Sequence, residues 1–528
     1  MEEMNEELLA PIEAAYEEDE LIEAVSDMST RVETGNLGTL PETATESHIA
    51  QFIFEQEKTN LLWLSSAGDS GELAIWTGKR WIEKDRGYRL LDGLISRWCD
   101  RLFIEMPAPS PSAKSDYRKK FMEARFQRGV RHLLITRLAQ PGVTCTSETE
   151  VFNNKPFLLG MRGTNSYLVA ELATGTIREV RRDDFISKCV RVTPDSTVVT
   201  PRTDRFFDEI TLGDADLKAF LLRLCALMLT AHPYQGIFFF WGHGRNGKGS
   251  LTRLMIHILG TQFVGVLRGT ELIVSKYDSD RAKRTYNKLE GARLATTSEA
   301  VGENLNLQML KEMTGGDRLA SAKMRQDDRT FAPTHKLILP TNERPVLPND
   351  AAFKGRVYFV PFRADFTDRA KQDPELEPTM QREAPGFLAK LIALCPEVIA
   401  NINTLSAPQS VLDSTREMLE ENDLAGQFKE DMLESTPGKH LSFEAAQNAA
   451  LDWLTEMPSD SEKPEKSSGI IPVSATQNYH ERNRQMAQII SGLKAKFIYK
   501  RIRPDVRERG RKIFHFLDVS LKKKVTES

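Results

Sequence analysis

Apolar and polar residues follow two different spacings along the chain, and together these spacings predict a mixed α/β protein. Residues 157–192 alternate apolar and polar side chains between glycine turns, which predicts several strands. Two apolar runs in residues 72–85 flank Thr77 and Gly78 and predict a β-hairpin. Apolar residues at helical spacing predict helices at 89–102, 125–138 and 217–231, the second of them basic.

A short apolar run, residues 236–241, predicts a buried strand that leads into a glycine-rich turn. Gly242, Gly247 and Lys248 have the spacing of a phosphate-binding loop, and a helix is predicted from Leu251. Glycines let several backbone N–H groups point at one anion, the helix adds its positive dipole end, and the lysine reaches the β- and γ-phosphates. An unliganded turn is the alternative. The order of strand, loop, lysine and helix favours a nucleotide.

The predicted nucleotide site consists of the loop and the residues directly after it. The residues expected to bind ATP are Gly242, His243, Gly244, Arg245, Asn246, Gly247, Lys248, Gly249 and Ser250. A hydroxyl usually follows the lysine directly, but Gly249 stands there. Ser250 is therefore the candidate hydroxyl for Mg2+, and the identity of the magnesium-holding hydroxyl stays open.

Later apolar segments end or begin next to polar residues that nucleotide hydrolysis could use. The strand predicted in residues 292–300 ends at Glu299, whose carboxylate could polarise the attacking water and lie near Mg2+. The next strand ends at Asn342, which could contact the γ-phosphate or orient the lytic water. Arg356 precedes a further strand and could reach the nucleotide of a neighbouring subunit. Taken singly, each is more readily explained as an ordinary strand-end or surface residue.

Residues 310–331 combine a Thr-Gly-Gly-Asp turn with a basic segment. Lys323, Arg325 and Arg329 could belong to a basic hairpin in the pore of a ring. Such a hairpin would contact DNA phosphates and make no base-specific contacts. A solvated charged loop explains this segment equally well when it is considered alone.

The order of these motifs resembles the superfamily 3 helicases. The motifs are GxGxNGKG, a strand ending in Ser-Glu, LKxxTGGD, PTxKLxLxTNxxP and DxAFxxRVxxVPF, and they are concentrated in residues 236–362. More narrowly, they are similar to the helicase part of phage and plasmid primase–helicase proteins. The WTGKRW and YLVAELATG segments are similar to the domain that precedes that helicase, so the resemblance covers residues 60–460.

The resemblance implies an AAA+-like α/β core, homo-hexameric rings, ATP and Mg2+ as cofactors, and translocation on single-stranded DNA, typically 3′ to 5′. By position, it assigns phosphate binding to Gly242, Gly244, Asn246, Gly247 and Lys248. It assigns the Walker B acid, with a share in holding Mg2+, to Glu299, the sensor to Asn342, the pore hairpin to Lys323 and the arginine finger to Arg356.

Two positions depart from the family pattern. Only Arg356 is available where the family often has two arginines, and Ala322 replaces the usual arginine of the hairpin. The primase half of the family is not evident in residues 1–200, which contain no zinc-binding cysteine set and no convincing metal-carboxylate cluster. Asp214 and Asp216 lie at a predicted helix start, where capping acids are expected. We therefore expect an ATPase and DNA helicase without priming activity.

Length and composition allow several globular domains and favour a cytoplasmic protein. The chain has 528 residues, of which 40% are hydrophobic and 28% charged. No apolar run reaches the ~18–20 residues of a membrane span, and the acidic N-terminus lacks a signal region. We therefore expect no membrane partner and a location in the cytoplasm. If the protein is phage-encoded, this is the cytoplasm of the host. The five cysteines are scattered without a CxxC pair, which predicts buried free thiols.

Composition also suggests the domain boundaries. We expect an acidic, disordered or partly helical arm at 1–45, a mixed α/β domain at 46–200, an ATPase domain at 201–375, a helical extension at 376–456, a linker at 457–469 and a basic winged-helix-like domain at 470–528.

The two ends of the chain carry opposite charge. Residues 1–50 contain 14 Asp/Glu and 1 Arg, whereas residues 480–528 contain 14 Lys/Arg and 5 Asp/Glu. Residues 483–519 predict a helix, a turn and a β-wing, as in a winged-helix domain. Protein docking is the competing interpretation of this tail. The residues expected to contact DNA are Lys323, Arg325, Lys494, Lys496, Arg509 and Arg511.

Three functions fit these features. The first is a replicative DNA helicase of a phage, prophage or plasmid, acting on single-stranded and duplex DNA together with other replication proteins. The second is an ATP-regulated replication initiator that binds an origin without processive unwinding. The third is a P-loop kinase, which the predicted pore hairpin and arginine finger disfavour.

Overall fold

The computed structural model describes most of the chain between Leu21 and Leu521. The described residues are 21–41, 43–65, 71–83, 85–140, 145–146, 151–164, 166–273, 278–297, 305–321, 329–342, 345, 351–368, 372–421, 424–456, 485–486, 489–490, 493, 499–502 and 513–521. The chain divides into two compact units. One comprises Met1–Val301, Asn306–Glu343 and Pro361–Pro408, and the other comprises Gly302–Leu305, Arg344–Val360 and Gln409–Ser528.

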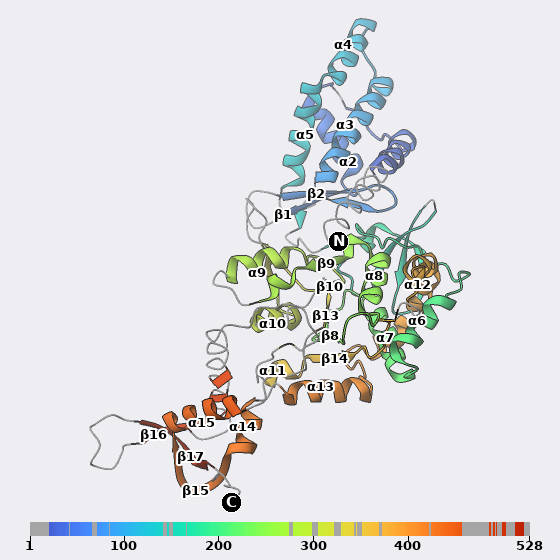
Figure 1. Cartoon of the computed structure of the whole chain (residues 1–528). Coiled ribbons are helices and arrows are strands. Elements are labelled where there is room, and N and C mark those ends of the chain that lie inside the picture. The colour runs from blue at the N-terminus through green and yellow to red at the C-terminus, as the bar shows by residue number, and fades with distance from the viewer. Residues whose placement is uncertain are drawn as a thin grey trace, which may run out of the picture. The chain divides into compact units, whose positions relative to one another are not determined.

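The first unit begins with a small sheet and a group of helices. The sheet has the order β3-β2-β1-β4, formed by β1 (Leu61–Ser65), β2 (Gly71–Trp76), β3 (Trp81–Glu83) and β4 (Cys145–Thr146). The predicted hairpin in residues 72–85 is confirmed, because Trp76 pairs with Trp81. The helices are α2 (Glu46–Glu57), α3 (Asp85–Glu105), α4 (Pro111–Met122) and α5 (Ala124–Leu138). They confirm the helices predicted at 89–102 and 125–138, and Figure 1 shows α3, α4 and α5 side by side.

Residues 21–34, within the predicted acidic arm, form a helix. Ala24, Met28 and Val32 are buried at a four-residue spacing and join the hydrophobic core of the neighbouring helices. The acidic face is also paired, since Lys79 contacts Glu23 at 3.3 Å. The apolar stripe and the Lys79–Glu23 ion pair hold this helix in place, although its acidic composition alone allows disorder.

A second antiparallel sheet confirms that residues 157–192 are rich in strands. It consists of β5 (Leu158–Arg162), β6 (Tyr167–Glu171) and β7 (Thr176–Glu179), in that order. A 3₁₀ turn, η1 (Arg182–Asp184), follows β7. Tyr167 and Val169 pack in one cluster with Trp76 and Trp81 of the hairpin, so the two sheets share a core.

A five-stranded sheet positions the predicted nucleotide loop. Its order is β14-β8-β13-β10-β9, and its strands are β8 (Ile237–Trp241), β9 (Val264–Leu267), β10 (Leu294–Thr297), β13 (Lys336–Thr341) and β14 (Val357–Pro361). β13 is parallel to β8 and β10, and β10 is parallel to β9. The parallel sheet confirms the α/β class, and nearly every residue of β8, β10 and β13 is buried, as expected for strands covered on both faces.

Helices cover both faces of this sheet. Figure 1 shows α6 (Pro201–Thr211), α7 (Ala215–Leu227), α8 (Lys248–Leu259) and α12 (Leu376–Ala400) on one side, and α9 (Asp278–Asn287) and α10 (Leu307–Gly315) on the other. Short 3₁₀ turns, η2 (Thr261–Phe263) and η3 (Gly269–Leu272), flank β9. α7 matches the helix predicted at 217–231, and Asp214 caps it, since its carboxylate accepts a hydrogen bond from Leu217 N at 3.0 Å.

The basic segment between α10 and β13 begins and ends as a hairpin. Gly316 ends α10 in the left-handed region with φ 85°, and β11 (Leu319–Ser321) pairs antiparallel with β12 (Arg329–Phe331). The register joins Ser321 to Arg329, which confirms the predicted hairpin. Lys323 and Arg325 lie outside the described residues.

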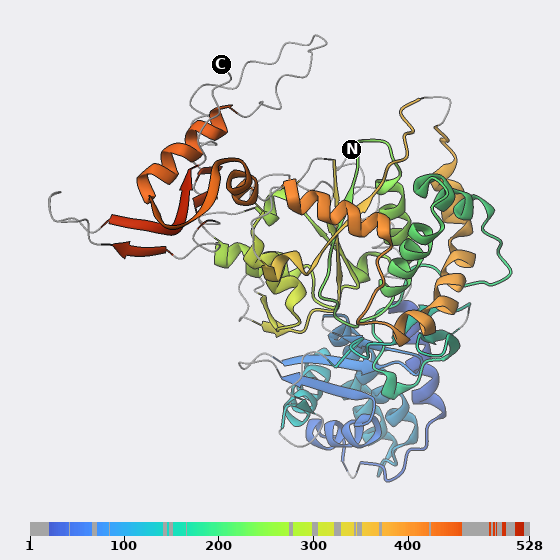
Figure 2. The same ribbon diagram turned by 90° about the horizontal axis from the view of Figure 1, so that it is seen from below.

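The second unit contains α11 (Ala351–Lys354), α13 (Gln409–Glu421) and a small sheet with helices against it (Figure 2). The sheet has the antiparallel order β15-β17-β16, with β15 (Leu433–Ser442), β16 (Tyr499–Ile502) and β17 (Ile513–Leu521). Helices α14 (Leu424–Met432) and α15 (Phe443–Glu456) share its apolar core, which includes Phe428, Trp453, Ile489 and Phe516.

This core shifts the C-terminal boundary relative to the expected one. A domain at 470–528 alone lacks β15, the edge strand that pairs with β17, and lacks the apolar side chains of α14 and α15. The folded C-terminal part therefore begins at α14, within the predicted helical extension. Lys494, Lys496, Arg509 and Arg511 lie outside the described residues.

Several cysteines are buried free thiols, as predicted. Cys99, Cys225 and Cys395 are buried, and Cys189 is half-buried. Burial raises the pKa of the three buried thiols to about 12, so they are protonated and unreactive near neutral pH.

Candidate nucleotide site

The candidate site begins where β8 ends and α8 starts. β8 is a run of aromatic residues that are buried in the sheet, and Gly242 to Gly247 form the loop to Lys248, the first residue of α8. His243, Gly244 and Arg245 are exposed, and Arg245 has a left-handed backbone with φ 60°. The loop thus exposes its apex while both of its ends are anchored.

Two glycines are required by the fold of the loop itself. Gly247 has φ 92°, and a Cβ there would overlap Ile210 Cγ2 and lie 3.2 Å from Phe206 Cε2, both in α6. A Cβ on Gly242 would overlap the carbonyl oxygen of Phe362. Gly244 differs, because no atom lies within 4 Å of a Cβ built at that position. The sequence motif contains all three glycines, but the structure shows that, of the three, only Gly242 and Gly247 lack room for a side chain.

The segment after β14 holds the loop in place through hydrogen bonds. Phe362 N donates to Trp241 O at 2.7 Å, and Asn246 Nδ2 donates to Phe362 O at 2.9 Å. Phe366 N donates to Arg245 O at 2.9 Å. Asn246 and Phe362 are both buried, so these bonds are shielded from water. The role of Asn246 in this structure is to hold the loop.

Lys248 lies inside the loop rather than on the surface. Its side chain is largely buried, and Nζ donates to Gly242 O at 2.5 Å and to His243 O at 3.2 Å. Burial lowers the pKa of Lys248 to about 8, because desolvation disfavours the ammonium form. A phosphate at the loop would restore the charged form by supplying an anionic partner.

The hydroxyl predicted to hold Mg2+ has a partner on another helix. Ser250 Oγ donates to Glu377 Oε1 of α12 at 3.0 Å, and Arg253 Nε donates to both oxygens of the same carboxylate at 3.0 Å. Burial opposes ionisation of Glu377, but the hydrogen bonds from Arg253 and Ser250 together lower its pKa. Coordination of Mg2+ through Ser250 would require Glu377 to release that hydroxyl or to join it. Sequence reasoning missed Glu377 because 127 residues separate it from Ser250.

The strand register brings Asn342 next to the phosphate loop. Thr341 pairs with Trp241, so Asn342 and Gly242 leave neighbouring parallel strands at the same level. Asn342 is exposed. β10 is the next strand, and it ends at Thr297, two residues before Glu299. Glu299 itself lies outside the described residues. The carboxyl ends of β8, β13 and β10 therefore meet at one edge of the sheet.

The remaining predicted site residue is Arg356. It follows α11 in the second unit, where Arg356 N donates to Phe353 O at 2.9 Å, and its side chain is half-buried. β14 begins at the next residue, which confirms the predicted placement of the arginine directly before a strand.

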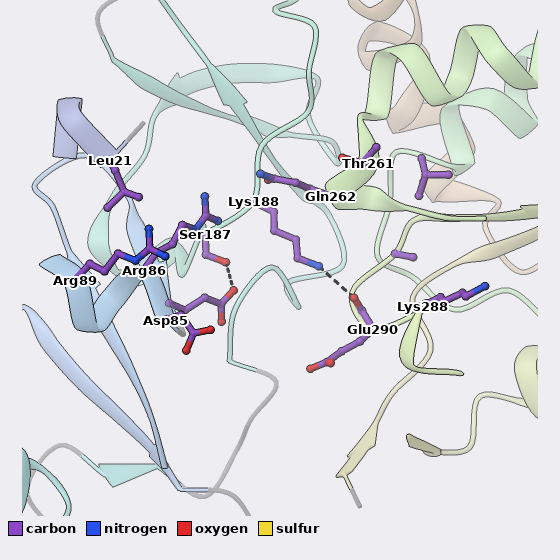
Figure 3. Close-up of a pocket in the computed structure, with 13 residues that line it drawn as sticks. Leu21, Asp85, Arg86, Arg89, Ser187, Lys188, Thr261, Gln262, Lys288 and Glu290 are labelled. Atoms are coloured by element: carbon purple, nitrogen blue, oxygen red, sulfur yellow. Dashed lines mark hydrogen bonds between the residues drawn. The ribbon is translucent and has the colours of Figure 1, made fainter. Parts of the chain in front are cut away.

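A separate cavity of about 770 Å³ lies in the first unit, at the start of α3 (Figure 3). Its lining includes Val264 and Ala292, which lie at the amino ends of β9 and β10, so the cavity is on the opposite edge of the sheet from the phosphate loop. Lys188 Nζ crosses it to donate to Glu290 O at 3.1 Å, and Lys288 forms an ion pair with Glu271 at 2.9 Å. The two lysines that line the cavity, Lys188 and Lys288, are thus already engaged with other residues. The cavity is separate from the candidate nucleotide site.

Within the described ranges, no three His, Cys, Asp or Glu side chains gather as a metal-binding group. None of the described helices combines the length and apolar character needed to span a bilayer.

The chain is similar to a family domain and to two viral proteins. Residues 58–212 match the family model described as "D5 N terminal like". The chain is 27% identical over 267 residues to "Putative helicase 022R" of Frog virus 3 (isolate Goorha), a match that covers 47% of this chain and 27% of the relative. It is 23% identical over 359 residues to "Putative helicase L207/L206" of Acanthamoeba polyphaga mimivirus, covering 64% of this chain and 37% of the relative. The chain thus spans well under half the length of either curated relative.

Among solved structures, the chain is similar to the A form apo structure of the NrS-1 C-terminal region. The identity is 11% and the TM-score 0.45, with 90% of this chain and 100% of that chain covered.

Proposed function

We propose that the chain is an ATP-dependent DNA helicase that hydrolyses ATP at subunit interfaces of a ring, translocates on single-stranded DNA and unwinds duplex during replication. The observation that carries this proposal is the phosphate loop, which keeps Lys248 buried among its own carbonyl groups at a strand end beside Asn342. The two viral relatives carry the name helicase, which supports the same activity for this chain.

The strand order supports an AAA+-like core. β13 lies between the phosphate-loop strand and β10, although β9 and β10 precede β13 in the chain. This arrangement aligns the loop, Asn342 and the strand that leads to Glu299 at successive positions along one edge. It suits a nucleotide whose γ-phosphate extends from the loop past Asn342 toward the carboxylate that activates water.

In the proposed mechanism each polar residue has one role. Lys248 contacts the β- and γ-phosphates, and the N–H groups of the loop and of α8 hold the same oxygens. Mg2+, when bound, would neutralise phosphate charge, with Ser250 and Glu299 as its candidate holders. Glu299 polarises the attacking water and Asn342 orients it. Arg356 stabilises the transition state from the neighbouring subunit.

DNA would be held by the basic hairpin and by the C-terminal part. The β11–β12 hairpin carries Lys323 and Arg325 in the residues between its strands. Lys494, Lys496, Arg509 and Arg511 provide the positive charge of the C-terminal part, whose phosphate contacts would be independent of base sequence.

Replacement of Lys248 tests the proposal. Lys248→Ala should abolish ATP hydrolysis and strand displacement on a forked DNA, since the charge opposite the phosphates is lost. Lys218→Ala is the matched control, because Lys218 pairs with Asp208 at the surface and should cost little stability and no activity. ATP turnover by purified Lys248→Ala equal to that of the unmodified protein would refute the proposal.

The second candidate, an ATP-regulated initiator, is favoured by the compact C-terminal part. Its sheet and helices form an apolar core of their own, and the sequence of this part is basic, as expected for a DNA-binding module. The two functions differ in strand displacement. DNA-stimulated ATPase activity without displacement of an annealed strand would favour the initiator.

A further inference from the structure

The turn between α4 and α5 carries an unusual density of positive charge. Glu123 alone separates the two helices, and residues 111–138 contain 8 Lys/Arg but only 2 Asp/Glu. We call five of these cations the basic turn, and all five are exposed: Arg118, Lys119, Lys120, Arg125 and Arg128.

Several other cations of the first unit are paired with carboxylates, and those of the basic turn are not. Arg31 contacts Glu57 at 3.0 Å, Lys58 contacts Glu55 at 2.8 Å, and Arg131, one turn beyond the basic turn, contacts Asp92 at 2.8 Å. Among the described residues, no side chain of the basic turn forms an ion pair. Unneutralised like charges on adjacent helix turns destabilise the fold, so the turn is available for an external anion.

The local helix dipoles strengthen this positive field. α5 has no acidic residue in its first turn, and the side chain of Glu123 makes no capping hydrogen bond. Arg125 therefore lies at the positive end of a 15-residue helix whose first N–H groups lack a side-chain acceptor. A cation at this position opposes helix stability, whereas a bound phosphate would satisfy both the N–H groups and the guanidinium.

The basic turn is held by contacts of its own, which matters for binding. Phe121 and Phe126 are buried, and their ring centroids are 5.6 Å apart across the turn. Gln127 Nε2 donates to Phe121 O at 2.9 Å and closes the turn from the side. Because the backbone is fixed by its own core, the cations are presented without an ordering cost for the loop that carries them.

We propose that the basic turn binds the phosphate backbone of duplex DNA, at a site distinct from the nucleotide loop, the β11–β12 hairpin and the C-terminal tail. The inference rests on the proposed function only in taking DNA as the substrate. Duplex is favoured over single-stranded DNA because Phe121 and Phe126 are buried, so the turn offers no exposed aromatic ring of its own for base stacking. Phosphate contacts from Arg and Lys suffice for a duplex.

The test compares two full-length variants that lose equal charge. The first carries Lys119→Gln, Lys120→Gln, Arg125→Gln and Arg128→Gln. The control replaces four exposed cations that are ion-paired: Lys58→Gln, Arg182→Gln, Arg382→Gln and Arg416→Gln. Binding to a labelled blunt duplex and to a single strand is measured by fluorescence anisotropy without ATP, at two salt concentrations.

The turn variant should bind duplex at least about tenfold more weakly at low salt, and its salt slope should fall by about two or more, since each phosphate contact contributes about 0.9. The control variant should bind as the unmodified protein does. Because ATP is absent, this outcome does not depend on whether the chain hydrolyses it.

Three results would overturn the proposal: unchanged duplex affinity in the turn variant, an equal loss in both variants, or a loss confined to the single strand. A charge-conserving variant (Lys119→Arg, Lys120→Arg, Arg125→Lys, Arg128→Lys) should retain duplex affinity. A loss there equal to that of the first variant would assign the effect to altered packing and would also refute it.

Discussion

Replacing single glycines of the phosphate loop should separate residues that shape the loop from residues that face the ligand. Gly247→Ala places a Cβ on a backbone with φ 92°, which costs roughly 1–2 kcal/mol. The same Cβ overlaps Ile210, which is itself buried, and displacing a packed side chain costs about 1–3 kcal/mol more. We expect a total loss of about 2–5 kcal/mol of stability. Gly244→Ala, with no atom within 4 Å of the new Cβ, should cost almost nothing.

The assay is thermal unfolding of the two purified variants, followed by ATP titration of each. A loss of 2–5 kcal/mol corresponds to a midpoint lower by at least about 4 °C for the transition of the ATPase part, at about 2–4 °C per kcal/mol. Gly244→Ala should keep its midpoint and should weaken only ATP binding, because its Cβ intrudes where phosphate oxygens approach the backbone. Equal midpoints for Gly247→Ala and the unmodified protein, or equal losses in the two variants, would refute the reasoning.

The remaining predictions concern chemistry at the same edge of the sheet. Glu299→Gln should bind ATP but hydrolyse it slowly, as seen in single-turnover experiments, because an amide is not a base; loss of binding with normal turnover of bound ATP would contradict the assignment. Arg356→Ala should lose ATPase activity and partly regain it when mixed with Lys248→Ala subunits, each of which supplies the half-site that the other lacks; verified subunit exchange without recovery would argue against a finger acting between subunits. Nucleotide affinity should fall above pH 8, by at most tenfold per pH unit, since the pKa of Lys248 is about 8 and ATP binds its protonated form; an affinity that is flat between pH 7 and 9 would show that this lysine stays charged without nucleotide.

Much of the nucleotide site could be predicted because its parts are local in the chain. A buried strand, a glycine-rich turn, a lysine and a helix follow one another within residues 236–259, and each has its own sequence signal. The strand ends that bear Asn342 and Glu299 were predicted in the same way. The alignment of these strand ends with the loop depends on the order of strands in the sheet. No local sequence pattern specifies that order.

The contacts that could not be predicted join residues that are distant in sequence. Glu377 holds Ser250 and Arg253 from a helix more than 120 residues away, and Phe362 closes the loop through Asn246. No periodicity in either segment indicates its partner. At the N-terminus, acidic composition alone does not choose between disorder and helix, and the packing of Ala24, Met28 and Val32 decides for a helix at residues 21–34. In each case the decisive information is tertiary contact.

A comparison of two buried lysines explains why burial alone does not mark the functional one. Lys336, at the start of β13, is fully buried, and its Nζ donates to Thr230 O at 2.5 Å, to Thr230 Oγ1 at 2.9 Å and to Thr334 O at 3.2 Å. Burial lowers its pKa well below the usual value, and these three acceptors leave no N–H of its amino group unpaired in either protonation state. Lys248 is also buried, but among the described residues its Nζ has two acceptors, both carbonyl groups of its own loop. An ammonium group has three donors, so one N–H of protonated Lys248 stays available for a phosphate. The unsatisfied donor, more than the burial or the lowered pKa, is the feature we expect of a lysine that binds a ligand, as proposed for Lys248.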